Sequence, residues 1–207
     1  MTIIFDSQTI VYTECIVCEQ LMQVINMGDH SHPCCDPDVT NPFWEPPPLM
    51  GAALQYAAWM WPVFPLGARS KKPAIPKEQG GHGFQDATTD RGGVRSWWNR
   101  NPRYNIGIAT GHRFDVIDVD PKAGGNESLT ELLAAHRIPT VHAVARTGSG
   151  GLHLYIKLRR ARNGAAILPG VDYRGLGGYV AVSPSTRGPG QTYTWLVVPS
   201  PTIKGRK

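Results

Sequence analysis

FDVIDVD, residues 114–120, is the stretch of the chain on which the predicted fold depends. It is a short apolar run that contains acids, and we read it as a β-strand, in which successive side chains point to opposite faces of a sheet. Asp118 and Asp120 are two positions apart and should share a face, whereas Asp115 should lie on the other face. Two neighbouring carboxylates repel each other unless a cation lies between them. The alternative for the pair is a strand end that caps the turn before Pro121.

Length and hydropathy limit the kinds of protein to which this strand can belong. A chain of 207 residues, 41% of them hydrophobic, is long enough for one large domain, or for one domain with a small appendage. We find no apolar run of about 18 residues, the length needed to cross a membrane. The first residues do not follow the pattern of a signal peptide. We therefore expect a cytoplasmic protein without a membrane partner.

Charge is divided unevenly along the chain. Residues 1–48 contain seven acids and no Lys or Arg. All 21 basic residues therefore lie in 49–207 with the remaining nine of the 16 acids, which gives this part +12 although the whole chain carries only +5. A basic body favours a polyanionic partner such as nucleic acid or a nucleotide, because binding releases counterions. The alternative is a basic protein tuned for solubility.

Cysteine content and proline content place a domain boundary near residue 48. All four cysteines lie within the first 35 residues. The proline-rich segment 41–50 interrupts regular structure, because proline lacks an amide donor. We expect an acidic Cys/His-rich module at 1–48, a main domain at 49–200 and a basic tail at 201–207.

The predicted elements of the main domain alternate between helices and short strands. Helical periodicity is seen at 51–61, 93–102 and 126–136, the last with Asn126 as a plausible cap. Strand patterns are seen at 63–66, 105–111, 114–120 and 191–198, with hairpins at 141–158 and 170–185. Residues 66–90 form a long polar loop, which is usually functional or disordered in compact domains. Short turns outnumber crossover helices, so we expect an α+β fold with mostly antiparallel pairing.

Three further residues have the chemistry expected beside an acid pair. His153 follows the turn Thr147–Gly151, whose hydroxyls and free amides suit a phosphate, although a lone histidine is more often part of a core. Asp172 offers a third carboxylate on another strand, or else a turn residue. Arg174 has the same strand parity as Asp172 and suits a phosphate or the balancing of carboxylates.

Basic and aromatic residues elsewhere suggest contacts with nucleic acid. Lys71, Lys72 and Lys77, with His82 close by, lie in the long loop and suit a template or a triphosphate, or simply solvent. Trp97 and Trp98 suit stacking on bases, although core packing is more typical for at least one tryptophan on such a helix.

Eight segments, in order, resemble the bifunctional DNA primase/polymerase (prim-pol) family of the archaeo-eukaryotic primase superfamily. The resemblance covers about residues 52–197 and rests on WPVFPLGARSKKP, HGFQDATTD, the Trp-Trp helix, NIGIATG, VIDVD, RTGSGGLHLYI, GVDYRGLGGYVAVSPS and YTW. It implies a catalytic core related to the RNA-recognition fold. A mixed, mostly antiparallel sheet would be flanked by helices and joined by a small α/β subdomain.

The resemblance also assigns roles to residues. Asp118, Asp120 and Asp172 would bind catalytic Mg²⁺ or Mn²⁺, and His153 would contact the phosphates of the incoming nucleotide. Accessory roles in nucleotide binding would fall to Ser149, Arg174 and Asn105. The superfamily often has a small hydroxyl residue two positions before this histidine, where this chain has Gly151. Ser149 or Thr147 would supply the hydroxyl instead.

The implied activity is template-directed nucleotidyl transfer on single-stranded DNA by a two-metal carboxylate mechanism, as a DNA primase, a DNA polymerase or both. Its partners would be a template, a primer, NTP or dNTP, and a separate replicative helicase, in a setting such as a mobile element. One alternative is a catalytically inactive module that binds single-stranded DNA and assists replication. Another is a different metal-dependent phosphotransfer enzyme, such as a nuclease.

The N-terminal module contains a zinc-binding pattern. The expected ligands are Cys15, Cys18, His32 and Cys35, for which Cys34 or His30 are substitutes. About 48 residues with few large aliphatic side chains fold poorly without such a staple. The alternative is four reduced, free thiols.

Overall fold

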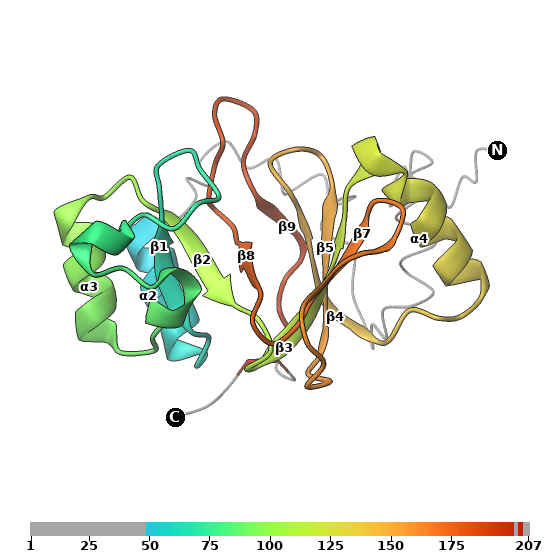
Figure 1. The fold of residues 1–207 in the computed structure, drawn as a ribbon, viewed down its shortest axis with the longest axis horizontal. Coiled ribbons are helices and arrows are strands. Elements are labelled where there is room, and N and C mark those ends of the chain that lie inside the picture. The colour runs from blue at the N-terminus through green and yellow to red at the C-terminus, as the bar shows by residue number, and fades with distance from the viewer. Residues whose placement is uncertain (1–48, 201–202, 205–207) are drawn as a thin grey trace, which may run out of the picture.

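Strand β3 (Phe114–Val119) lies inside a six-stranded antiparallel sheet of order β6-β7-β3-β5-β4-β9 (Figure 1). The computed structural model describes residues 49–200 and 203–204. The other strands of this sheet are β4 (Val141–Arg146), β5 (Leu152–Lys157), β6 (Gly164–Leu168), β7 (Val171–Arg174) and β9 (Thr194–Val197). The expected α+β class and antiparallel pairing are confirmed, as is the hairpin of β4 and β5. A relation to the RNA-recognition fold remains a prediction.

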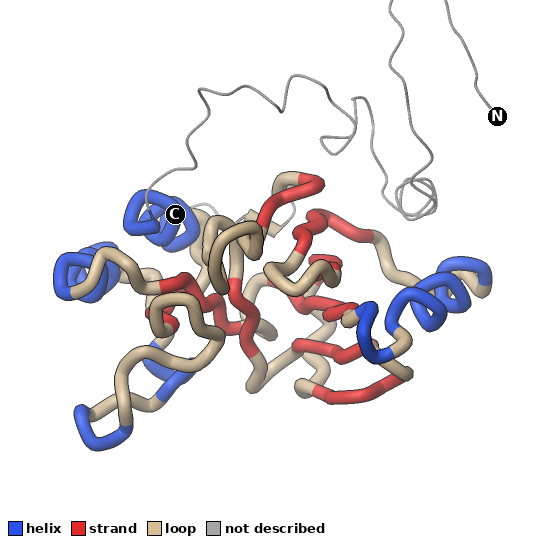
Figure 2. Tube along the Cα trace, turned by 90° about the horizontal axis from the view of Figure 1, so that it is seen from above, coloured by secondary structure: helices blue, strands red, loops and turns tan. Residues whose placement is uncertain are grey.

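A second, three-stranded antiparallel sheet of order β1-β2-β8 lies beside the first. It consists of β1 (Val63–Leu66), β2 (Asn105–Ala109) and β8 (Tyr179–Ala181). Helices α2 (Leu49–Ala58) and α3 (Arg91–Arg100) accompany this sheet, whereas α4 (Gly125–Ala134) lies at the other end of the molecule (Figures 1 and 2). Both predicted helices before residue 105 are therefore present.

The chain passes between the two sheets instead of forming the second predicted hairpin. Strand β7 pairs with β3 and β6, whereas β8 pairs with β2, so the hairpin predicted at 170–185 is wrong. The intervening residues bond elsewhere: Leu176 donates its amide to Ala161 and accepts from Asn163. A glycine-rich link indicates a turn, but it does not reveal whether the flanking strands pair with each other. Strands β2 and β3 are likewise consecutive but belong to different sheets.

The six-stranded sheet has an apolar core on each face, because β3 has apolar residues at both odd and even positions. Phe114 and Val116 point toward α2, α3 and the small sheet, in a cluster that includes Trp61 and Tyr155. Ile117 and Val119 point toward the cluster that contains the leucines of α4. Asp115 shares this second face, where its Oδ2 accepts from the hydroxyl of Tyr173 at 2.6 Å. The parity argument for Asp115 is confirmed.

Helix α4 begins one residue earlier than its expected cap. Its N-cap is Gly124, with a φ of 86°, and no side chain caps the helix, so the prediction for Asn126 is wrong. A Cβ on Gly125 would lie 2.6 Å from the carbonyl oxygen of Asp120 and 2.7 Å from that of Gly170. The two glycines are therefore required for different reasons: Gly124 has the left-handed conformation, and at Gly125 the end of β3 and the β6–β7 turn leave no room for a side chain.

The long loop at 66–90 contains short ordered elements. Two 3₁₀ turns, η2 (Lys77–Gln79) and η3 (Gly83–Asp86), lie within it, and isolated bridges join Leu66 to Pro73 and Val63 to Thr88. Within the described residues, no helix has the length and apolar character required to span a membrane.

The residues just before the C-terminus pack onto the core. Ile203 is fully buried, and its carbonyl oxygen accepts a hydrogen bond from the indole of Trp61 at 2.8 Å. The amine of Lys204 lies 4.3 Å from the ring centre of Trp59. These two residues, which we expected in a basic tail, therefore contact the domain.

Candidate active site

The register of the six-stranded sheet places Asp172, Asp118 and His153 in one row across three strands. Asp118 on β3 is directly opposite Asp172 on β7 and directly opposite His153 on β5. Directly opposed residues of antiparallel strands point to the same face, with their Cβ atoms about 5 Å apart. The row therefore brings together two acids and an imidazole that are far apart in the sequence.

Both carboxylate oxygens of Asp118 have basic neighbours. Oδ1 lies 3.4 Å from Nε2 of His153, and Oδ2 accepts from Nε and Nη2 of Arg174 at 3.3 and 3.2 Å. The same Nη2 also donates to Oδ2 of Asp172 at 2.5 Å. Oδ1 of Asp172 accepts from the amide of Ala166 at 2.6 Å. One guanidinium therefore bridges two acids on neighbouring strands.

Burial and these neighbours act on the pKa of Asp118 in opposite directions. Burial of its carboxyl raises the pKa, but the hydrogen bond and charge of His153 and the guanidinium of Arg174 together outweigh that effect and lower the pKa to about 2. Asp118 is therefore ionised at neutral pH. Nδ1 of His153 is buried and has no hydrogen-bond partner among the described residues. The network consequently favours the tautomer with a proton on Nε2, directed at Asp118.

Asp120 lies just beyond the end of β3. Its Oδ1 accepts from the amide of Lys122 at 3.0 Å and so caps η4 (Pro121–Ala123). This is the turn-capping contact that the sequence offered as the alternative. Asp120 nevertheless lines the same cavity as Asp118 and Asp172, so the capping contact and a place in the site occur together.

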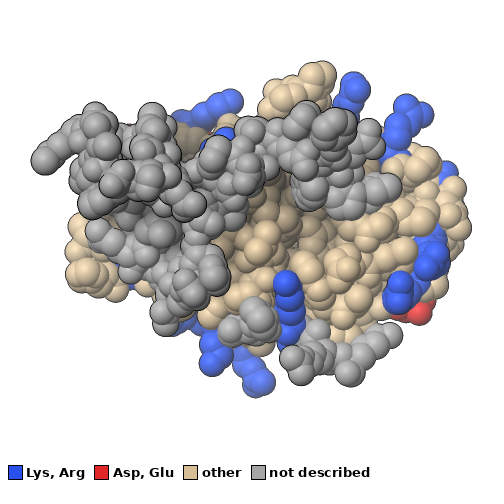
Figure 3. All heavy atoms as spheres, turned by 180° about the vertical axis from the view of Figure 1, so that it is seen from behind, with Lys and Arg blue, Asp and Glu red and all other residues tan. Residues whose placement is uncertain are grey.

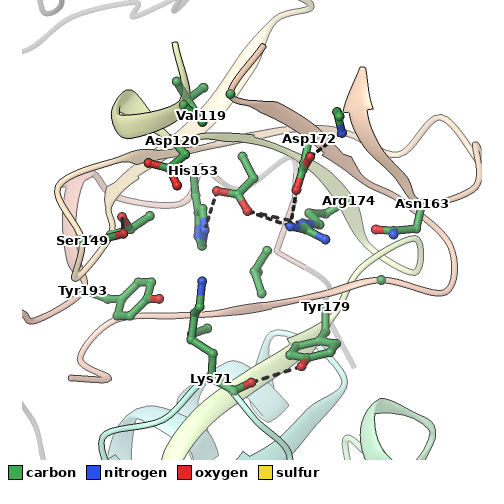
Figure 4. A pocket seen from close by; sticks show the side chains of 18 of the residues that line it. Lys71, Val119, Asp120, Ser149, His153, Asn163, Asp172, Arg174, Tyr179 and Tyr193 are labelled. Atoms are coloured by element: carbon green, nitrogen blue, oxygen red, sulfur yellow. Dashed lines mark hydrogen bonds and ion pairs between the residues drawn. The ribbon is translucent and has the colours of Figure 1, made fainter. Parts of the chain in front are cut away.

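These residues line a cavity of about 520 Å³ between the two sheets (Figure 4). Its walls come from both sheets and from the loops beside them. The lining side chains with polar groups are Asp118, Asp120, Asp172, His153, Thr147, Ser149, Arg174, Asn163, Lys71, Tyr179 and Tyr193. The cavity is large enough for a nucleotide-sized ligand.

The glycine-rich turn between β4 and β5 presents two hydroxyls to the cavity. Oγ1 of Thr147 accepts from the amide of Gly151 at 2.9 Å and lies 3.1 Å from Oγ of Ser149. A Cβ on Gly151 would lie 2.2 Å from the carbonyl oxygen of Val119. No side chain fits at position 151 unless the backbone moves, which explains why the hydroxyls come from positions 147 and 149.

The opposite wall of the cavity contributes a lysine and two tyrosines. Lys71 extends from its loop toward His153, and its carbonyl oxygen accepts from the hydroxyl of Tyr179 at 3.1 Å (Figure 4). The ring of Tyr193 lies 5.8 Å, centre to centre, from that of His153. Burial raises the pKa of Tyr193 to about 12; the charge of Asp118 adds to this effect, and Arg187 opposes it. The phenol therefore remains a hydrogen-bond donor at neutral pH.

Several predicted site residues lie outside the cavity. Lys72, Lys77 and Asn105 do not line it. The buried amide of Asn105 donates to the carbonyl oxygens of Ser70, at 3.0 Å, and of Thr186, at 2.7 Å. It therefore anchors the loop that carries Lys71.

The two tryptophans of α3 belong to the hydrophobic core of the domain. Trp98 is fully buried, and Trp97 packs against the same cluster. The candidate zinc ligands Cys15, Cys18, His32 and Cys35 lie outside the described residues, as do the substitutes Cys34 and His30.

Sequence reasoning did not identify Tyr179, Tyr193 or Asn163. Tyr179 and Tyr193 lie within segments that were noted for their resemblance to the family, GGYVAVSPS and the stretch around YTW, but nothing in either pattern predicts that the side chain points into the cavity. Asn163 lies in a link between strands, where a polar residue is ordinary.

The fit of a divalent cation can be assessed from the donor atoms. Three carboxylates on one cavity supply the hard oxygens that Mg²⁺ and Mn²⁺ prefer. Across residues 49–200 and 203–204, however, no three His, Cys, Asp or Glu side chains are clustered tightly enough to hold a metal ion. At this site the guanidinium of Arg174 lies between two of the acids. The chemistry of the donor set fits such a cation, provided that Arg174 moves aside.

Basic side chains also mark the outer surface. Figure 3, which shows the back of the molecule, has Lys and Arg projecting around the rim, and few Asp or Glu are visible among the residues that the structure describes. A polyanion is electrostatically compatible with these exposed basic side chains.

A comparison with protein families agrees with this site. The model of the bifunctional DNA primase/polymerase N-terminal domain, Prim-Pol, matches residues 53–203, which is more than half of the chain. No match was found among curated proteins. The matched segment contains both sheets and every described residue that lines the cavity. The family implies primase/polymerase-type activity, with DNA and nucleotides as substrates. The chain therefore belongs to the bifunctional DNA primase/polymerase (Prim-Pol) N-terminal domain family.

Proposed function

We propose that this protein transfers nucleotides to a primer strand on a single-stranded DNA template, with Asp118, Asp120 and Asp172 as the ligands of Mg²⁺ or Mn²⁺. The observation that carries the proposal is the row of Asp172, Asp118 and His153, which opens into a cavity also lined by Asp120 and Lys71. Acidic and basic groups converge there, as nucleotidyl transfer requires.

The chain's own residues divide the binding of a nucleotide between the two walls. Lys71, Arg174 and Nε2–H of His153 are donors for the oxygens of a triphosphate. The hydroxyls of Thr147 and Ser149 add uncharged donors beside them. Tyr179 offers a ring surface for the sugar or base, whereas Tyr193 is only 2% exposed and supports His153. Together these groups hold the α-phosphorus near the acids and orient it for attack.

The acids supply the negative side of the site. Asp118 is ionised at neutral pH because its pKa is lowered, so it needs no deprotonation before it binds a cation. A bound divalent cation would polarise the phosphate and stabilise the charge that develops on the attacking and leaving oxygens. Asp172 and Asp120 provide the further oxygens that such a cation requires.

The test is primer extension on single-stranded DNA with Mg²⁺ or Mn²⁺, comparing the wild type with Asp118→Asn. We expect Asp118→Asn to reduce incorporation by about a thousandfold or more, since the loss of a central carboxylate removes charge stabilisation of the transition state. Glu131→Gln, an exposed change on α4 outside the cavity, should extend the primer like the wild type. Thermal melting shows whether both variants remain folded.

Three results separate this proposal from its rivals. Undiminished incorporation by folded Asp118→Asn would contradict the proposal. Tight binding of single-stranded DNA without any incorporation by the wild type would favour the inactive accessory module. Degradation of labelled DNA without added nucleotide would favour a nuclease. The same assay on unprimed template, with NTP and dNTP in turn, tests primer synthesis.

A further inference from the structure

We propose that the guanidinium of Arg174 bridges the carboxylates of Asp118 and Asp172 in the free protein. When a nucleotide binds, the guanidinium leaves the carboxylates and binds the triphosphate instead. Its departure opens the acid pair to the divalent cation. The inference rests on the proposed function, because it presupposes that these acids bind metal. It adds that nucleotide binding and metal binding are coupled through one side chain.

The contacts of Arg174 show that it occupies the position between the two acids. Nη2 lies 3.2 Å from Oδ2 of Asp118 and 2.5 Å from Oδ2 of Asp172. The remaining oxygens face other donors, Nε2 of His153 for Asp118 and the amide of Ala166 for Asp172. Three of the four carboxylate oxygens of the pair therefore have a hydrogen-bond or ion-pair donor at 3.3 Å or less, and the fourth faces Nε2 of His153 at 3.4 Å. A cation that binds both acids must displace at least the guanidinium.

Charge makes this displacement obligatory. A divalent cation and a guanidinium repel each other strongly at contact distance in a partly buried site. The side chains of Asp118, Asp172 and Arg174 are only 24, 28 and 27% exposed, so solvent screens the repulsion poorly. If Arg174 has no other anion to bind, a cation that displaces it breaks its ion pairs with Asp118 and Asp172, and this loss weakens cation binding.

The cavity offers such a partner once it holds a triphosphate. The guanidinium faces the space that is also lined by Lys71, His153, Thr147 and Ser149, all of which carry hydrogen-bond donors. A triphosphate bound there has more negative charge than either carboxylate and accepts the two parallel hydrogen bonds that a guanidinium makes best. Arg174 would then exchange one set of anions for another inside the same cavity.

If Arg174 couples the two ligands, its removal should change the affinity for the metal ion and the affinity for the nucleotide in opposite directions. Removing the guanidinium frees the acids for the metal and deprives the triphosphate of a donor. Arg174→Gln should therefore bind Mn²⁺ more tightly in the absence of nucleotide. The same variant should bind nucleotide more weakly in the absence of metal. A residue that merely stabilised the site would weaken both.

The experiment uses the full chain and two binding measurements. Free Mn²⁺ is followed by electron paramagnetic resonance during titration of the protein without nucleotide, and binding of a fluorescent dATP analogue is measured in EDTA. For Arg174→Gln we expect Mn²⁺ affinity to rise about tenfold and the affinity for the analogue to fall about tenfold. A change of this size corresponds to the loss of one hydrogen bond to a charged group. Arg113→Gln, which removes an exposed arginine between β2 and β3, should match the wild type in both.

The outcomes distinguish a failure of the inference from a failure of the proposed function. Mn²⁺ affinity of Arg174→Gln equal to or below that of the wild type overturns the inference, even if Asp118→Asn abolishes incorporation. No Mn²⁺ binding by either protein, together with full incorporation by Asp118→Asn, overturns both. If Arg174→Gln does not fold, Arg174→Lys replaces it. Lysine keeps the charge but bridges two carboxylates poorly, so a smaller rise in Mn²⁺ affinity is expected and its absence counts against the inference.

Discussion

The two walls of the cavity are built in different ways. Two acids of the acidic wall, Asp118 and Asp172, lie on strands, and Asp118 is positioned by the hydrogen-bonded register of β3 with β5 and β7. The basic wall depends on a loop, in which Lys71 is positioned by two contacts from side chains to the backbone. These contacts come from Tyr179 to Lys71 and from Asn105 to Ser70. The acidic wall is therefore largely part of a sheet, whereas the basic wall is a loop that is hydrogen-bonded to strand residues.

Because the two walls are held in different ways, substitutions in them should have different effects. Strand register is shared among many backbone hydrogen bonds, so the acidic wall keeps its geometry until the sheet itself is disturbed. The loop that carries Lys71 has fewer backbone hydrogen bonds, chiefly those between Gly67 and Lys72 and between Ala74 and Pro65, so it shifts more easily when a side-chain contact is lost. Substitutions in the acidic wall should therefore change stability or abolish chemistry, whereas substitutions in the basic wall should change affinity.

The largest effect on stability is expected where the acidic wall is most crowded. Gly151→Ser places a Cβ about 2.2 Å from the carbonyl oxygen of Val119, so the β4–β5 turn must move away from β3. We expect a loss of about 3 kcal/mol in the free energy of unfolding, which urea denaturation measures. Gly150→Ser is the matched control: its Cβ meets nothing within 4 Å, but its φ is 89°. The control should cost only about 1 kcal/mol.

Equal losses for these two variants would show that the turn yields freely and that the acidic wall is not rigid. The test also bears on the departure from the family pattern. A serine at position 151 should not improve nucleotide binding, because Thr147 and Ser149 already supply hydroxyls beside His153.

The next effect concerns acid stability. The pKa of Asp118 is about 2 in the folded protein, below its ordinary 3.8, so its ionised form stabilises the fold above about pH 4. That contribution should be lost as the pH falls toward 2, because the unfolded chain binds the proton more readily. Its size is at most about 2 kcal/mol, since the side chain is partly exposed.

Urea unfolding at several pH values between 5 and 2 measures this contribution, with Asp118→Asn as the reference. The stability of the wild type should fall more steeply than that of the variant, so the two curves converge at low pH. Parallel curves would show that His153 and Arg174 do not stabilise the ionised carboxylate and would weaken the account of the acidic wall.

The smallest effect is expected in the basic wall. Lys71→Ala removes a charge that points into the cavity, whereas Lys72→Ala removes the same charge from a neighbour outside it. Steady-state primer extension should show a rise of about tenfold in KM for the nucleotide with Lys71→Ala. Lys72→Ala should change it little. A similar rise for both would mean that a general positive field, and not a positioned lysine, attracts the nucleotide.

Sequence reasoning predicted the acidic wall better than the basic wall, and the reason is physical. Alternation in β3 predicts which face Asp115 and Asp118 occupy, because side chains in a strand follow a period of two. Partners across the sheet are not encoded in that period. The convergence of Asp172 and His153 on Asp118 followed from the resemblance to a family, and the structure supplies the register that brings them together.

Predictions in the loops failed or remained open for a different reason. Lys71 and Lys72 are alike in charge and adjacent in sequence, yet only Lys71 lines the cavity. The loop that presents Lys71 is held by contacts with distant residues, among them Tyr179, which lies 108 positions away. The expected hairpin at 170–185 failed similarly, since the destination of β8 depends on its pairing with β2. Contacts between residues so far apart in the sequence produce no local sequence pattern from which they could be predicted.

The chain passes from one sheet to the other after β2, after β7 and again after β8, and a shared cluster around Trp61 joins both. Because the two sheets share this buried cluster and are linked three times by the chain, moving them apart would expose apolar side chains to water. The fold therefore opposes wide opening of the cavity between the sheets.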